Sequence, residues 1–517
     1  MSTTTVTNET ATERKVKEGA PLWQSILFWL AVIALVLVAF NLRLYELGFP
    51  FDRDGYDEGV YWQTLRAMSA GHPLYAQTFY SQPPFFMLSV YPVYALLGGT
   101  LWSARFGIVL VSLLALPGAF LLGKALCGRP GALALMLLIA IDPFYLAQSQ
   151  TLQAEAPCVA FMLLAIGCAY SWWEHPEGIT GIVLAALTGI ATALSIWSKF
   201  FGFAALIPIC LLILARLWQI ARKVAPAQRL VALLPIAVGI VALALTSLLV
   251  LFPYLGAHHL LLADIVYFHT AANTVYQSAQ ANNLNVMRGL LTSIMAAAAC
   301  YGMIVALLRG DWRVLPLIGW LLGSIYLLYD QVPLFHHHLV ILIPPMAGLA
   351  VIGIGGKVAP LAFGPAVKNR TLVAKIAGGV ALVLVLVAAG LNLQSDQTYF
   401  VNASTQSMNT QTRQDEQVAT DLQRLISPNE QVITDAQFIA ALANRDVPPS
   451  LVDTSLVRIQ TGYLTTQQVI DAASSPRVHA VLFFTGRLQR LGGFHAWVAR
   501  HFHLAYRYGS GQELWVR

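Results

Sequence analysis

The chain has 517 residues, of which 57% are hydrophobic and only 11% are charged. A soluble protein of this length needs more charged surface, so we expect lipid to surround most of the chain. The net charge of +6 does not indicate nucleic-acid binding, because the basic residues fall in loops between apolar runs. The cysteines lie in or beside those runs and form neither a disulfide framework nor a CxxC metal motif.

Residues 1–22 are polar and rich in threonine, and we expect a disordered cytoplasmic N-terminus there. The apolar run that follows is too long for a removable signal peptide and has no clear cleavage site. Similar runs of about 20 residues recur, each long enough for the roughly 30 Å hydrocarbon core. We predict about eleven spans, at residues 24–44, 102–123, 131–148, 157–173, 179–196, 200–217, 229–252, 286–308, 313–329, 337–354 and 372–393.

Residues 83–98 are apolar but too few to cross the membrane. As a helix they would extend only about 24 Å, and Pro92 interrupts them. Tyr91 and Tyr94 suit the membrane–water interface. We therefore predict two interfacial helices, this one and the amphipathic segment that begins at Asp57.

The basic residues give the expected orientation. The outer loops before residue 394 hold Arg43, Arg53, Arg66 and Lys199. The inner loops hold many more, namely Arg14, Lys15, Lys17, Lys124, Arg129, Arg216, Arg222, Lys223, Arg229, Arg309, Arg313, Lys357, Lys368, Arg370 and Lys375. This positive-inside bias predicts a cytoplasmic N-terminus and an external C-terminus.

From residue 394 the sequence becomes polar. Strand-like segments at 431–435 and 478–484 are separated by helical patterns, and residues 503–517 alternate like a hairpin. Strands that alternate with helices indicate an α/β domain. The predicted fold is an α-helical polytopic membrane domain over residues 23–393, followed by a small extracytoplasmic α/β domain over 394–517.

Acidic residues are concentrated directly after the first span, at Asp52, Asp54, Asp57 and Glu58. Ionisable groups in a membrane protein are costly and often functional, although the inference is weaker at the boundary. Stabilisation of an interfacial helix through its dipole explains Asp57 and Glu58 equally well. The rigid corner Gln82–Pro84 that follows favours a site for one of these acids, and we interpret Asp52 and Asp54 as solvated neighbours.

Two further charged residues fall at the same boundary. Glu155 precedes the fourth predicted span, and we expect its carboxylate to face Asp57, which would raise one pKa and prepare a base near neutrality. Lys199 lies between two spans and could hold a lipid phosphate as it leaves. A helix-start carboxylate and a snorkelling lysine are the alternatives.

Histidines gather there too, at His258, His259, His336, His337 and His338. Adjacent histidines in one loop cannot all ligate one ion, so we assign no metal and leave a divalent metal open as a cofactor. Hydrogen bonding to phosphate or sugar and plain polar lining both fit these residues. We take His258, His259, His337 and His338 as candidate substrate-binding residues.

The motifs follow one another in a recognisable order. They are DEGVY (57–61), GHPLY (71–75), SQPPFF (81–86), an arginine-containing span (103–128), QTLQAEAP (150–157) and SKFFG (198–202). This order resembles the polyprenyl-phosphate-sugar-dependent glycosyltransferases. The GT-C fold of these membrane enzymes is shared by protein O-mannosyltransferases, lipid A aminoarabinose transferases and oligosaccharyltransferase catalytic subunits. The resemblance covers residues 42–212 well and the rest only in layout.

The resemblance implies that Asp57 is the catalytic base, that Glu155 is the second outer-loop acid, and that Lys199 contacts phosphate. We add Glu58 and Gln82 as candidate substrate-binding residues. At Gln82 this chain departs from the family, whose aminoarabinose transferases have an acidic–basic pair before the prolines and whose mannosyltransferases often have histidine. We do not transfer a metal.

The resulting prediction is an inverting glycosyltransferase in the plasma membrane, acting at the extracytoplasmic face. Its partners would be a polyprenyl-phosphate sugar donor, the bilayer, and an acceptor hydroxyl on protein, lipid or glycan, with no nucleic acid. A transporter or flippase of lipid-linked saccharide is the alternative, and it predicts internal repeats and midplane polar groups that we do not find in the sequence. A catalytically inactive scaffold is a third reading.

Overall fold

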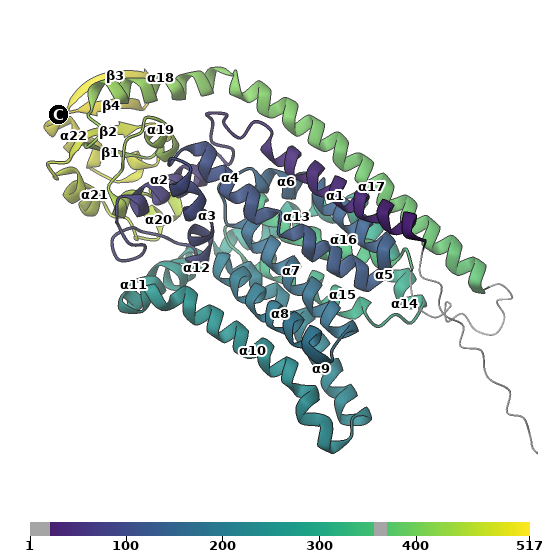
Figure 1. Cartoon of the computed structure of the whole chain (residues 1–517). Helices are drawn as coiled ribbons and strands as arrows, with labels where there is room; N and C mark the ends of the chain where they lie inside the picture. Colours follow the sequence, from purple (N-terminus) through teal and green to yellow (C-terminus); the bar gives the residue numbers. More distant parts are fainter. Residues whose placement is uncertain (1–20, 356–369) are drawn as a thin grey trace, which may run out of the picture.

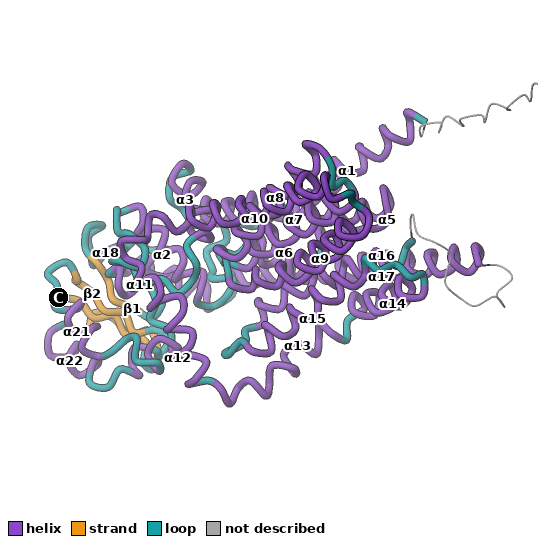
Figure 2. Tube along the Cα trace, turned by 90° about the horizontal axis from the view of Figure 1, so that it is seen from below, coloured by secondary structure: helices purple, strands orange, loops and turns teal. Residues whose placement is uncertain are grey.

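The computed structural model describes residues 21–355 and 370–517. Nearly all of the predicted disordered N-terminus, together with Lys357 and Lys368, lies outside the described residues. The described part is an elongated helical bundle with a small sheet domain at one end (Figures 1 and 2). The predicted class, a helical membrane protein with a C-terminal α/β domain, is confirmed.

The bundle is built from long apolar helices and shorter connecting helices. In chain order they are α1 (Leu22–Leu44), α2 (Asp57–Ser69), α3 (Phe85–Leu96), α4 (Leu101–Ser112), α5 (Ala115–Ala140), α6 (Pro143–Ser149), α7 (Glu155–Glu174), α8 (Gly178–Ser198), η1 (Phe200–Ala205), α9 (Leu206–Lys223), η2 (Pro226–Gln228), α10 (Arg229–Leu251), η3 (Phe252–Ala257), α11 (His258–Leu262), η4 (Ala263–Tyr267), α12 (Phe268–Val275), η5 (Gln277–Asn282), α13 (Asn283–Leu291), α14 (Ile294–Leu308), α15 (Val314–Asp330), η6 (His336–Leu342), α16 (Ile343–Ile352) and α17 (Arg370–Ser407).

Within the described residues, seven helical runs are long and apolar enough to cross a membrane, or eight if a bent pair counts as one span. The predicted spans at 313–329 and 337–354 correspond to shorter apolar helices. The structure therefore confirms a multi-span protein without fixing the number at eleven. Helix α3 has only 12 residues, in keeping with a segment too short to cross.

One predicted span differs from a straight helix. The span expected at 286–308 is broken between α13 and α14, where the axes bend by 81°. Ser293 starts the second helix, because its side chain accepts a hydrogen bond from the Ala296 N–H at 3.2 Å. Average hydropathy does not register such a cap, so the sequence pattern predicted one span where the chain turns sharply.

The chain reverses direction within α5. Cys127 and Gly128 leave helical geometry, and Gly128 has φ +68°. A Cβ built on Gly123 would lie 2.2 Å from the Gly131 carbonyl oxygen. Residues eight apart in a straight helix are separated by about 12 Å, so this contact requires a hairpin. The two arms are consistent with separate spans on either side of a tight turn.

The sheet domain follows α17, which continues unbroken past the predicted boundary at residue 394. Its elements are α18 (Thr410–Leu425), β1 (Gln431–Thr434), α19 (Gln437–Leu442), η7 (Pro449–Leu451), α20 (Leu456–Gln460), α21 (Thr466–Ala473), β2 (Val478–Phe483), η8 (Leu488–Arg490), α22 (Phe494–His501), β3 (His503–Gly509) and β4 (Gln512–Val516). The strand order is β1-β2-β4-β3, with β1 and β2 parallel and the other pairs antiparallel. The strands predicted at 431–435, 478–484 and 503–517 are present.

Helix α2 joins the two parts of the molecule by packing against α19 of the sheet domain. A Cβ built on Gly59 would lie 2.4 Å from the Phe438 backbone nitrogen, so only glycine allows this approach without a shift. Farther along α2, Arg66 pairs with Asp446, with 2.6 Å between Nη2 and Oδ1. The first turn of α2, which begins at Asp57, is therefore fixed beside the sheet domain.

Candidate active site

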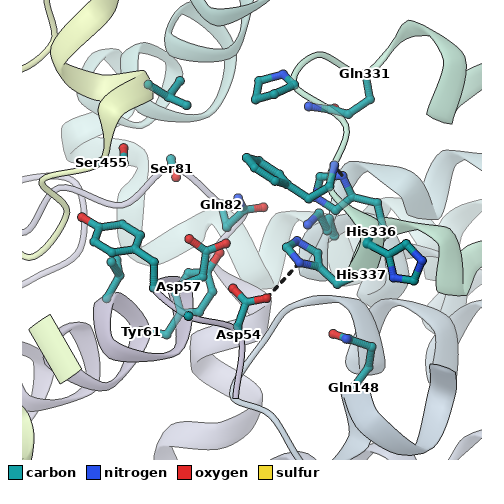
Figure 3. Close-up of a pocket in the computed structure, with 18 of the residues that line it drawn as sticks. Asp54, Asp57, Tyr61, Ser81, Gln82, Gln148, Gln331, His336, His337 and Ser455 are labelled. Atoms are coloured by element: carbon teal, nitrogen blue, oxygen red, sulfur yellow. Dashed lines mark hydrogen bonds and ion pairs between the residues drawn. The ribbon is translucent and has the colours of Figure 1, made fainter. Parts of the chain in front are cut away.

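A cavity of about 930 Å³ lies where the bundle meets the sheet domain. Its walls come from segments far apart in the sequence, which the fold brings to one end of the bundle (Figure 3). The lining includes residues 53–57, 81–83, 143–144, 147–148, 199–201, 331–333, 335–338 and 455–457, together with Asp453 and Arg487. Most of the residues that the sequence singled out belong to these segments.

Asp57 is the first residue of α2, and its side chain lies in the cavity (Figure 3). Burial and the neighbouring negative charge of Asp54 raise the pKa of Asp57 to about 7. The positive charges of His337 and Lys199 act in the opposite direction, and Asp453 adds a further upward contribution. A carboxylate with a pKa near neutrality can take a proton from a hydroxyl group.

Glu58, one residue further, has a different role from the one we expected. It is fully buried and does not line the cavity. Both of its oxygens accept from Arg105, at 2.8 Å from Nε and 2.7 Å from Nη2, and they also accept from the Arg53 and Leu152 N–H groups. Glu58 thus has no free acceptor for a ligand, and its assignment to substrate binding is corrected.

Arg105 uses its remaining N–H groups to hold the loop that leads to Asp57. It donates to the carbonyls of Leu47, Phe49 and Phe51 at 2.7–2.9 Å. An arginine with every contact inside the protein fixes the path of the backbone around it. The buried Glu58–Arg105 pair is therefore the structural support of the Asp57 segment.

Asp54 was expected to be a solvated neighbour, but it lines the cavity. Its Oδ1 lies 3.0 Å from Nδ1 of His337 (Figure 3). Burial alone would raise the pKa of Asp54, but the hydrogen bond and charge of His337 outweigh it and lower the pKa. Asp52 instead closes a turn, where its Oδ1 accepts from the N–H groups of Asp54 and Gly55.

Glu155 and Lys199 lie together, although not as expected. Lys199 Nζ donates to Glu155 Oε1, and Glu155 is buried outside the cavity lining. The charged neighbour that raises the pKa of Asp57 most is Asp54 rather than Glu155. Lys199 lines the cavity and Glu155 does not, so Glu155 orients the Lys199 ammonium group from the side away from the cavity.

The structure also brings two adjacent histidines to one point. The Nε2 atoms of His337 and His338 each lie 3.6 Å from Glu155 Oε1, and the three groups offer ligand atoms within 4.8 Å of one another. Two imidazoles and a carboxylate suit a divalent ion such as Zn²⁺. The expectation was that adjacent histidines cannot all ligate one ion, and this group contains His337 and His338 but not His336. Because Lys199 supplies a positive charge to the same oxygen, we assign no metal to the site.

The remaining candidates divide into two groups. Gln82 lines the cavity, and its backbone carbonyl accepts from the Tyr75 hydroxyl at 2.8 Å. His258 and His259 are exposed on α11 and are not among the cavity-lining residues. His269, which follows on α12, does line it and bonds the Ser81 carbonyl oxygen at 2.8 Å. In this loop, the histidine in the cavity lining is thus His269, and substrate binding by His258 and His259 stays a prediction without support from the lining.

The sheet domain contributes residues that the sequence did not identify. Asp453, Ser455 and Arg487 line the cavity. The guanidinium of Arg487 lies 3.9 Å from the centre of the Tyr56 ring. No local motif marks these positions, because they reach the cavity only after the sheet domain docks on α2.

The chain is similar to known proteins in part of its sequence and in its fold. The family model for dolichyl-phosphate-mannose-protein mannosyltransferase matches residues 61–263. That region contains most of α2, the proline corner, Glu155 and Lys199. No curated protein sequence matches the chain significantly.

Solved structures match over nearly the whole length. ArnT from Cupriavidus metallidurans in the apo state is 12% identical, with a TM-score of 0.63, covering 95% of this chain and 98% of that one. The same protein bound to undecaprenyl phosphate matches with a TM-score of 0.60, 12% identity and coverage of 96% and 98%. The Archaeoglobus fulgidus oligosaccharyltransferase is 14% identical, with a TM-score of 0.52 and coverage of 92% and 72%. The solved structures show that this chain has the fold of these membrane proteins, and the family model matches its N-terminal part.

Proposed function

We propose that this protein is a glycosyltransferase that moves a sugar from a polyprenyl-monophosphate donor to an acceptor hydroxyl, with Asp57 as the general base. The observation that carries the proposal is the Asp57 carboxylate in the cavity, with its pKa raised to about 7 and Lys199 in the same lining. A base and a cation in one cavity are the two groups that the displacement of a phosphate from a sugar requires.

The proposed reaction is a single displacement. Asp57 takes the proton of the acceptor hydroxyl as its oxygen attacks the anomeric carbon from the side opposite the phosphate. The bond between that carbon and the phosphate oxygen breaks, and its electron pair leaves with the polyprenyl phosphate. Lys199 stabilises the charge that develops on this leaving group. Attack from the opposite side inverts the anomeric configuration.

The donor class is supported by the match to ArnT bound to undecaprenyl phosphate. In this chain, Lys199 keeps two N–H donors for a phosphate oxygen while its third contacts Glu155. His337 and Gln82 line the same cavity and can bond sugar or phosphate oxygens. The positive-inside bias supports a cavity that opens on the extracytoplasmic side.

Replacement of Asp57 by Asn tests the mechanism. We expect transfer of labelled sugar from undecaprenyl-phosphate sugars to fall by roughly 100-fold or more, the usual contribution of a general base, while binding of undecaprenyl phosphate is retained. Asp52→Asn is the matched control, because the Asn oxygen still accepts the turn hydrogen bonds. Near-normal turnover of Asp57→Asn would refute the proposed base.

The pH profile gives a second readout. Asp57 must be deprotonated to accept a proton, so transfer should fall as pH decreases through about 7 and level off above it. Asp54→Asn removes a negative neighbour of Asp57 and should move the midpoint to lower pH. An unchanged midpoint in that variant would assign the titration to another group.

A further inference from the structure

The sheet domain presents one cationic side chain to the cavity, that of Arg487. Its backbone is held firmly. The buried carboxylate of Asp435, directly after β1, accepts from the N–H groups of Phe484, Thr485, Arg487 and Leu488 at 2.8–3.1 Å. Four hydrogen bonds to one carboxylate fix the loop after β2. The base of the Arg487 side chain is therefore preorganised.

The end of the side chain is also positioned. The Arg487 guanidinium lies over the face of Tyr56, 3.9 Å from the ring centre. The Tyr56 hydroxyl accepts from the Thr454 N–H at 2.8 Å and lies 3.3 Å from an Asp453 oxygen, so the ring is fixed to the sheet domain. Tyr56 directly precedes Asp57, and the stacked guanidinium thus lies beside the catalytic segment.

Arg487 differs from the other arginine and lysine side chains of the cavity lining in having no acceptor. Arg53 donates to Gln150 and Tyr399, and Lys199 donates to Glu155. Among the described residues, the Arg487 side chain has no hydrogen bond or ion pair, only the Tyr56 ring.

Arg458 of the same domain shows the contrasting case. It also stacks on an aromatic ring, at 3.7 Å from the Phe79 centre, but its N–H groups donate to the carbonyls of Ser450 and Asp453. Arg458 does not line the cavity. Arg458 thus has a structural role, whereas Arg487 keeps its N–H groups available for a ligand.

A guanidinium with a free edge favours oxyanions, because two of its N–H groups can donate in parallel to two oxygens of a carboxylate or phosphate. We propose that Arg487 binds an anionic group of the acceptor, and that the acceptor substrate therefore carries a carboxylate or phosphate near its reactive hydroxyl. This inference rests on the proposed function, in which Lys199 contacts the donor phosphate. Two anion contacts on two different elements then allow donor and acceptor to be recognised separately.

The test compares two simple acceptor mimics that differ in one charge, octyl glucuronide and octyl glucoside. We expect the purified full-length protein to bind the glucuronide roughly 10-fold or more tightly, the usual effect of a charge-assisted hydrogen bond. Arg487→Gln should remove the preference, and Arg487→Lys should retain part of it, because lysine keeps the charge but loses the paired geometry. Arg490→Gln, an exposed arginine three residues away outside the cavity lining, is the matched control.

Binding of undecaprenyl phosphate distinguishes acceptor from donor recognition. It should be unaffected by Arg487→Gln and weakened by Lys199→Gln. A loss of undecaprenyl phosphate binding in Arg487→Gln, or an unchanged glucuronide preference, would overturn the proposal. Asp57→Asn should keep the preference, so failure of the catalytic mechanism and failure of the anion contact give different results.

Discussion

The two walls of the cavity are held in place by different kinds of contact. The bundle wall rests on the Glu58–Arg105 pair, in which both side chains are 0% exposed. The sheet-domain wall docks through the close approach at Gly59 and through the Arg66–Asp446 pair, whose side chains are 14% and 39% exposed. A buried charge without its partner costs several kcal/mol, whereas an exposed ion pair contributes little. The bundle wall is thus expected to be rigid and the sheet-domain wall easier to displace.

The largest effect should come from breaking the support of the bundle wall. Arg105→Gln leaves Glu58 as an uncompensated buried charge, so we expect the protein to lose about 3–5 kcal/mol of stability. Thermal unfolding in detergent, followed by tryptophan fluorescence, measures this loss. The double variant Arg105→Gln, Glu58→Gln should recover part of it. A single variant as stable as the parent would show that the pair does not support the loop.

A smaller effect should come from the docking contact. Gly59→Ala places a methyl group against the Phe438 backbone, and the overpacking should cost about 1–3 kcal/mol. Because the strain acts between the two parts, the sheet domain should be released by protease faster while the bundle stays intact. Gly390→Ala, on α17 with nothing within 4 Å of the new Cβ, is the control and should change neither. Equal cleavage of both variants would contradict the docking role.

The smallest effect should come from the exposed ion pair. Arg66→Ala and Asp446→Ala should each lower stability by less than about 1 kcal/mol, with a coupling energy that decreases at high salt. A double-mutant cycle measured at two salt concentrations checks this expectation. Coupling as large as that of the buried pair would remove the difference between the two walls.

Local sequence patterns predicted those parts of the fold that local forces determine. The long apolar runs indicated a multi-span helical protein, and the short apolar run at 478–484 identified the buried strand β2. The bend between α13 and α14 was missed, because it depends on one capping serine that an average over 20 residues does not register. The boundary predicted at residue 394 was taken from the change to polar residues. That change does not end the helix, because the polar residues that follow still favour helical structure, and α17 continues to Ser407.

The candidate site shows a similar division. Asp57, Gln82, Lys199 and His337 were predicted from acids, prolines and lone charges, and all of them line the cavity. Their roles in catalysis and binding stay predictions. Neighbouring side chains on one helix turn point in different directions, so composition alone could not separate Glu58 from Asp57.

Arg487 could not have been found from the sequence. It is about 430 positions from Asp57, and only the docked sheet domain brings it to Tyr56. The residues that complete the cavity from this domain follow from tertiary packing rather than from any motif.

Helix α17 connects the bundle to the sheet domain, which forms one wall of the cavity. With 38 residues it extends about 57 Å, well beyond a hydrocarbon core of roughly 30 Å. Its far end is tied to the bundle, where Tyr399 bonds Arg53 and Ser404 bonds Glu46. These contacts hold the C-terminal part of α17 against the bundle. Displacement of the sheet-domain wall is therefore expected to be limited at the α17 side, so the part of an acceptor that reaches Asp57 would have to fit between this wall and the bundle.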